Sequence, residues 1–126
     1  LEVMNPHERT TKAGRQPIYF ETIPAGAKGK FSIIYLPFDL LGLPLEDIKR
    51  EVTTDLKIIR ETVRQMMRIY GFSAKKSSGF GIAGNLLDEG LLKSKLFTED
   101  YRFSDFDQMK AGFESLLREV KANVGR

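Results

Sequence analysis

Two lysines, two serines and two glycines fall within seven consecutive positions, Lys75-Lys76-Ser77-Ser78-Gly79-Phe80-Gly81. Ammonium groups and hydroxyls bind phosphate oxygens, and glycine lets a backbone approach a ligand closely. This composition predicts a surface that binds an anionic polymer. The alternative is an ordinary connecting loop whose glycines only end a helix and turn the chain, and composition alone does not separate the two.

The stretch continues into Gly79-Phe80-Gly81-Ile82-Ala83-Gly84, which matches the pattern GxGxxG. A dinucleotide fingerprint needs a strand before this pattern and a helix after it, whereas here a helix is expected before it and a strand after it. A Walker A loop needs its lysine and hydroxyl after the second glycine, and here they precede the first. We reject both interpretations and expect no cofactor.

A long amphipathic helix is expected from Leu45 to Tyr70, because apolar residues recur there with helical spacing. Its apolar stripe consists of Ile48, Val52, Leu56, Ile59, Val63, Met66, Met67 and Tyr70. Gly71 follows as the residue expected to end the helix.

Basic residues occupy the opposite arc of this helix, namely Arg50, Lys57, Arg64 and Arg68. Glu46 and Glu61 fall in the same arc, so we interpret most of it as a solvated face. Arg68 is the exception, because it lies in the last turn beside the glycine-containing loop and is a candidate phosphate ligand.

The polar segment from Asn5 to Gln16 is expected to be an exposed loop, and it carries the basic residues Arg9, Lys12 and Arg15. It also holds His7, the only histidine of the chain, which beside Glu8 could do acid–base chemistry on RNA. No second catalytic group can be placed beside His7, so a surface histidine that contacts RNA without catalysis is the better interpretation. We expect no metal site, since the carboxylates show no ligand-like clustering.

The remaining pattern indicates a small α+β arrangement. Strands are expected at 1–4, 18–23, 30–36 and 81–87, with a turn at 24–29 that joins the second and third into an antiparallel hairpin. Residues 88–101 allow either a strand or a short helix. A second helix is expected at 104–123 with Ser104 as its cap. Its core stripe is Phe106, Met109, Phe113, Leu116, Leu117 and Val120.

Composition sets the limits of these interpretations. The chain has 126 residues, of which 41% are hydrophobic, enough for one domain or for half of a larger one. Its net charge of +3 is small, so a nucleic-acid site must come from local clustering. The absence of cysteine excludes disulfides and fits a cytoplasmic protein. No apolar run reaches the roughly 18 residues that a membrane span needs, so we expect no membrane contact.

Three stretches together resemble a known family: Ile18 to Phe31 with its Pro-Ala-Gly turn, the helix at 45–70, and the loop from Phe72 to Gly81. The loop is similar to a motif of the form G-x-K-[ST]-S-x-G-[FY]-G, although Phe72-Ser73-Ala74 separates Gly71 from the lysines. In this order they resemble the RAMP superfamily of CRISPR-associated proteins, in particular the RNA-binding backbone subunits of type III interference complexes. The resemblance covers roughly residues 3–87.

The resemblance implies the second half of a ferredoxin-like, RRM-like domain, with an antiparallel sheet packed by the long helix and the C-terminal helix. The chain would then be the C-terminal portion of a larger RAMP domain, with the first half upstream of Leu1. Segment 5–16 would correspond to the thumb of the family and loop 72–82 to its glycine-rich loop. The implied partners are CRISPR guide RNA and other subunits of the effector complex. No residue matches the family's catalytic aspartate, so no catalytic residue is expected within this chain.

Two alternatives remain open. The chain could belong to a RAMP endoribonuclease that processes the guide precursor with His7 as acid or base. It could also be a subunit-interaction module with little direct RNA contact. Phe38 and Phe80 could stack on bases, or could equally anchor their loops in the core.

Overall fold

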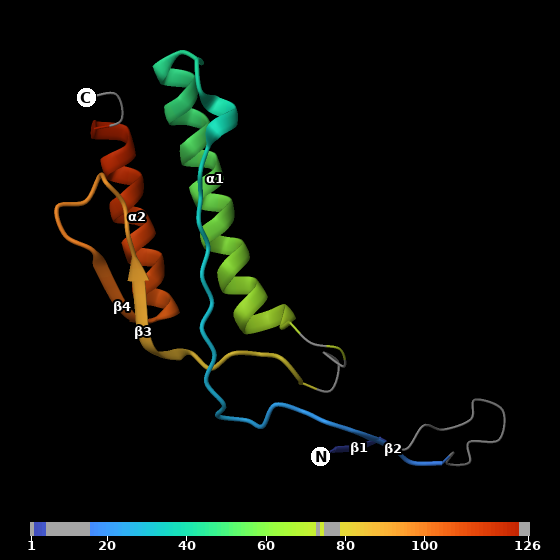
Figure 1. Cartoon of the computed structure of the whole chain (residues 1–126). Coiled ribbons are helices and arrows are strands. Elements are labelled where there is room, and N and C mark those ends of the chain that lie inside the picture. The colour runs from blue at the N-terminus through green and yellow to red at the C-terminus, as the bar shows by residue number, and fades with distance from the viewer. Residues whose placement is uncertain (1, 5–15, 73, 75–78, 124–126) are drawn as a thin grey trace. The chain divides into compact units, whose positions relative to one another are not determined.

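The computed structural model describes residues 2–4, 16–72, 74 and 79–123 (Figure 1). The chain belongs to the α+β class, as predicted. It divides into two compact units, residues 1–35 and residues 36–126, and each is described separately.

The first unit contains a small antiparallel pair of strands. β1 (Glu2–Met4) pairs with β2 (Ile18–Phe20), with Val3 opposite Tyr19. A tight turn follows, in which the Ala27 N–H donates to the Pro24 carbonyl at 3.1 Å and Gly26 has a φ of 85°. Positive φ at the third position is typical of a type II turn, so the turn expected at 24–29 is confirmed.

The hairpin expected between residues 18–23 and 30–36 is wrong. β2 ends at Phe20 and pairs with β1, while residues 30–36 lie outside any strand although all of them are described. Ile34 within this segment is 82% exposed. The β-branched, apolar composition gives these residues strand propensity, but a strand also needs a partner edge beside it.

The second unit begins with a short 3-10 turn (Phe38–Leu40) whose Leu40 is buried. α1 (Leu45–Gln65) follows and continues into a single π-helical turn (Met66–Tyr70), so the helix predicted at 45–70 is confirmed in extent. Glu46 and Asp47 lie in its first turn, where carboxylates interact favourably with the helix dipole.

β3 (Leu86–Leu92) and β4 (Tyr101–Asp105) form an antiparallel hairpin. The strand expected at 81–87 is therefore displaced toward the C-terminus, and the undetermined segment 88–101 contributes strand and turn rather than helix. α2 (Phe106–Asn123) follows directly. Its cap is Asp105 and not Ser104, because an Asp105 carboxylate oxygen accepts the backbone N–H of Gln108 at 2.7 Å. The Ser104 backbone N–H and hydroxyl instead donate to the Gln108 side chain.

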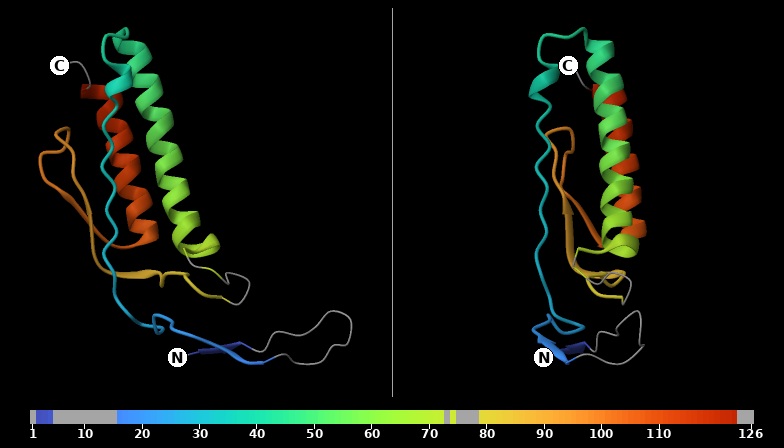
Figure 2. Two further views of the ribbon diagram at one scale, coloured as in Figure 1. Left: turned by 45° about the vertical axis from the view of Figure 1, so that its right-hand side comes forward. Right: turned by 90° about the vertical axis from the view of Figure 1, so that its right-hand side faces the viewer.

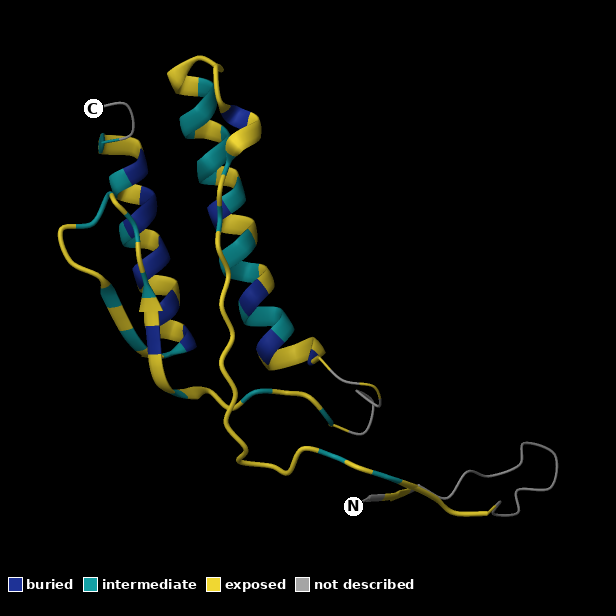
Figure 3. Cartoon of the chain, viewed as in Figure 1, coloured by how far each residue is buried: buried dark blue, intermediate teal, exposed yellow. Residues whose placement is uncertain are grey.

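The core of the second unit centres on α2, which packs against both α1 and the β3–β4 hairpin (Figures 1 and 2). All six residues predicted for its stripe are buried, and Val120 is only 1% exposed (Figure 3). Leu56 and Val63 are the buried residues of α1, and Met67 is the buried residue of the π turn that follows. The hairpin is thus covered mainly by the C-terminal helix, and α1 packs on that helix rather than chiefly on the sheet.

Candidate functional site

The end of α1 departs from α-helical geometry at the point where the glycine-containing loop begins. The Gly71 N–H donates to the carbonyl of Met66 at 2.8 Å, five residues back, instead of to that of Met67. The Met67 carbonyl accepts the N–H of Ala83 at 2.8 Å instead. The N–H of Ala83, which follows the loop, therefore replaces the N–H of Gly71 as the donor to the Met67 carbonyl.

Two further hydrogen bonds close the base of the loop. An Arg68 guanidinium N–H donates to the Ala83 carbonyl at 2.6 Å, and the Phe72 N–H donates to the Gly81 carbonyl at 3.2 Å. We call this closure the loop neck, and it consists of Met66, Met67, Arg68, Gly71, Phe72, Gly81 and Ala83.

Glycine is required at the neck for both conformation and space. Gly71 has φ 68° and ψ 175°, a backbone region that is essentially confined to glycine. A Cβ on Gly71 would lie 3.0 Å from the carbonyl carbon and oxygen of Gly81. Gly79 and Gly81 also have positive φ values, of 83° and 81°. Space around a Cβ at Gly79 is open, so there only the backbone conformation favours glycine.

The residues predicted to bind phosphate fall partly outside the described structure. Lys75, Lys76, Ser77 and Ser78 lie outside the described residues, and so do His7, Arg9, Lys12 and Arg15 of the predicted thumb-like loop. Gly79, Phe80 and Gly81 are described, and they lie on the return side of the loop, with Phe80 half-buried.

Arg68 stabilises the loop neck, a role that could not be predicted from the sequence. It is exposed, but it anchors the neck through the Ala83 carbonyl. A guanidinium carries five N–H donors, so this one hydrogen bond leaves it able to contact a phosphate as well. The prediction that Arg68 binds phosphate therefore remains compatible with its position.

Tyr70 is the residue that sequence reasoning misplaced. Helical spacing put it in the buried stripe, yet it is 61% exposed, while Met67 one turn earlier is buried. The wider π turn accounts for the difference, because it advances the chain by less rotation per residue than the α-helical spacing assumes. Ile69 and Phe72 beside it are exposed as well. The one feature of the sequence that could have indicated an exposed aromatic side chain here is the run Tyr70-Gly71-Phe72, which precedes Lys75 and Lys76.

The stretch of sequence that contains the neck is basic, although Arg64 near its start pairs with Glu61 at 3.4 Å. From Thr62 to Leu87 the sequence holds no acidic residue and four basic ones, Arg64, Arg68, Lys75 and Lys76. Such clustering of cations attracts a polyanion even when the net charge of the chain is small.

Elsewhere on α1 the basic arc is largely neutralised, as the solvated-face interpretation predicts. Arg50 pairs with Asp47 at 2.8 Å, and the hydrogen bond to Asp47 raises the pKa of Arg50 above its usual value. Glu61 accepts a hydrogen bond from the Gln65 amide at 2.9 Å, which together with Arg64 lowers the pKa of Glu61.

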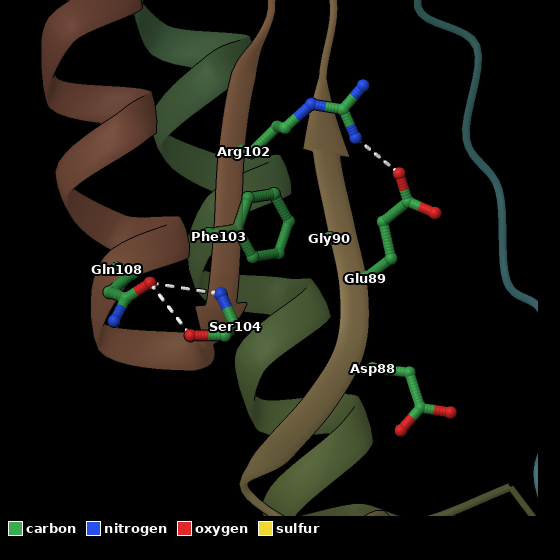
Figure 4. Close-up of a pocket in the computed structure, with 7 residues that line it drawn as sticks. All are labelled: Asp88, Glu89, Gly90, Arg102, Phe103, Ser104 and Gln108. Atoms are coloured by element: carbon green, nitrogen blue, oxygen red, sulfur yellow. Dashed lines mark hydrogen bonds and ion pairs between the residues drawn. The ribbon is translucent and has the colours of Figure 1, made fainter.

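A second, shallow depression lies over the hairpin and the start of α2 (Figure 4). It is lined by Asp88, Glu89, Gly90, Arg102, Phe103, Ser104 and Gln108. Two of its charged side chains neutralise one another, because the Arg102 guanidinium pairs with Glu89 across the strands. Within the described residues, no group of histidine or carboxylate side chains is arranged to hold a metal ion.

In the described part of the chain, none of the helices combines the length and apolar character that crossing a bilayer requires. Comparison with models of protein families, with curated proteins and with solved structures finds no significant match.

Proposed function

We propose that the chain binds CRISPR guide RNA as a subunit of a type III antiviral interference complex, as the resemblance to RAMP proteins implies. The observation that carries this proposal is the loop neck. It fixes both ends of a glycine-containing loop at the end of α1, within a stretch of chain that has four cations and no acid. Such a complex acts in the cytoplasm, and the chain would form the second half of a ferredoxin-like domain.

Each part of the loop has a role in this proposal. Lys75 and Lys76 neutralise phosphates, while Ser77 and Ser78 donate hydrogen bonds to phosphate or 2′-hydroxyl oxygens. Gly79 and Gly81 let the RNA backbone approach closely. The basic residues of segment 5–16 (Arg9, Lys12 and Arg15) add contacts to the sugar-phosphate backbone.

The double variant Lys75→Ala/Lys76→Ala of the full chain tests the loop. Measured by fluorescence anisotropy at several salt concentrations, it should bind guide RNA more weakly than wild type. The slope of log affinity against log salt should fall by about two, one for each lost phosphate contact.

The matched control is Lys110→Ala/Lys121→Ala, which removes the same charge from exposed positions of α2. It should change binding far less. Equal losses for the two double variants would mean that net charge, and not the loop, determines RNA affinity, and the proposal would then be wrong.

A subunit-interaction module is the second candidate function. It is favoured by residues 30–36, which are mostly apolar, lie outside any strand and include Ile33 and Ile34 among the exposed side chains. Ultraviolet crosslinking in an assembled complex separates the two. If the RNA crosslinks to residues 72–82, RNA binding is favoured. If the RNA crosslinks only to other subunits and not to this chain, the interaction module is favoured.

A further inference from the structure

The π turn at the end of α1 changes which residue faces solvent. Had the helix continued with α-helical hydrogen bonds, Tyr70 would extend the buried line of Val63 and Met67. The bond from the Gly71 N–H to the Met66 carbonyl moves Tyr70 outward, where most of its side chain is exposed. Single π turns of this kind occur frequently at functional sites.

The backbone that carries Tyr70 is held by two hydrogen bonds, from the Gly71 N–H to the Met66 carbonyl and from the Ala83 N–H to the Met67 carbonyl. Tyr70 is followed by the constrained Gly71 and then by the exposed Phe72, so an exposed aromatic side chain stands on each side of Gly71 in the chain. The nearest charged residues in the chain are cations, with Arg68 two positions before Tyr70 and Lys75 five after it. Aromatic rings among cations suit a polymer with flat bases and an anionic backbone.

We propose that Tyr70 stacks on an unpaired nucleobase of the bound RNA, with the π turn holding its ring beside the loop and Phe72 widening the stacking surface. This inference rests on the proposed RNA binding and adds to it that the site recognises exposed bases, not only phosphates. A duplex offers no free base face, so the loop should prefer single strands over duplexes of equal length.

The chemical nature of the contact can be tested with the full chain and a 5′-labelled oligouridylate of about 20 nucleotides, a length that exceeds typical single-strand sites. Tyr70→Ala should weaken binding roughly 5- to 140-fold, the range found when a stacking aromatic is removed. Tyr70→Phe keeps the ring and should bind like wild type, whereas Tyr70→Leu keeps only apolar bulk and should bind like Tyr70→Ala. The salt slope should be the same in all three variants, because no phosphate contact is lost.

The sequence contains no tryptophan, which gives an independent spectroscopic readout. Tyr70→Trp introduces a single indole, whose fluorescence should be quenched when oligouridylate binds and a base stacks on it. Ile58→Trp is the matched control, because Ile58 is also an exposed apolar side chain but lies near the middle of α1. Its fluorescence should not change.

An abasic ribose-phosphate chain of the same length separates stacking from phosphate binding. Wild type should bind it more weakly than oligouridylate, and Tyr70→Ala should not weaken it further. If wild type binds both chains equally, or if Tyr70→Leu retains full affinity, the stacking assignment is overturned while RNA binding stands. If wild type binds neither chain, the proposed function itself fails, and the stacking assignment with it. Circular dichroism of each variant confirms that the helices are intact.

Discussion

The ring of Phe103 lies directly over Gly90 on the neighbouring strand, in the space that a side chain at Gly90 would occupy (Figure 4). The two residues are opposite one another in the β3–β4 register, and a Cβ on Gly90 would be 2.1 Å from the ring. The same arrangement recurs between Tyr101 and Gly112 of α2, where a Cβ would be 2.6 Å from the ring. Alternate residues of β4 thus place aromatic rings on glycines, one on β3 and one on α2, which brings β4 close to both elements.

Gly90→Ala should therefore destabilise the chain, by about 1–3 kcal/mol, because the ring of Phe103 must move out of a packed position. The free energy of unfolding in urea measures the loss. In a Phe103→Leu background the added methyl group meets a smaller and more adjustable side chain, so the cost of Gly90→Ala should shrink. An equal cost in both backgrounds would show that the ring is not what excludes a side chain at position 90.

Gly71→Ala should open the loop neck. It places a Cβ in a backbone conformation confined to glycine and against the Gly81 carbonyl, with an expected cost of about 1–3 kcal/mol from the conformation alone. Gly42→Ala is the control, because Gly42 also has positive φ but has open space around it. Hydrogen exchange at the Ala83 amide should accelerate in Gly71→Ala and stay unchanged in Gly42→Ala. Protection of that amide in both variants would contradict the neck.

Leu56 and Ile58 offer a matched test of the packing of α1 on α2. Leu56 is 6% exposed and Ile58 is 58% exposed, although only two positions separate them. Leu56→Ala should cost about 2–5 kcal/mol of stability, as buried leucine truncations do. Ile58→Ala should stay within about 0.5 kcal/mol, as substitutions on an exposed surface do. Similar losses in the two variants would mean that α1 packs through a different face.

Acid should weaken the last turns of α1 through Glu61, whose pKa the Gln65 hydrogen bond lowers. Because the carboxyl titrates at lower pH in the folded chain, its contribution is present above the unfolded pKa and is lost as pH falls through the folded pKa. Nuclear magnetic resonance titration of the Glu61 carboxyl should give a midpoint below the ordinary value. In Gln65→Leu the midpoint should move up, and an unchanged midpoint would assign the shift to Arg64 instead.

The two helices could be predicted from the sequence because their stripes repeat over many turns. Phe106 and Val120 are buried where helical spacing puts them, since every turn of α2 repeats the same signal. Tyr70 escaped prediction because a change of one hydrogen-bond partner rotates it, and no spacing rule encodes that change. Segment 30–36 was wrongly predicted to be a strand. Its composition gives it strand propensity, but composition does not tell whether another strand lies beside it to form hydrogen bonds. The end of the helix before the loop was predicted from Gly71, but the neck depends on Ala83, whose side chain carries no chemical signal.

Because of the neck, the sequence of the loop can change without changing the end of the helix that precedes it. All four of its hydrogen bonds use backbone groups or Arg68, so they do not depend on which side chains occupy positions 73–78. The entropic cost of closing a loop grows only slowly with its length. Insertions at positions 73–78 should therefore cost little stability, as substitutions there do. Substitutions at positions 73–78 can therefore change which ligand is bound, while the hydrogen bonds of the neck keep the geometry of the preceding helix.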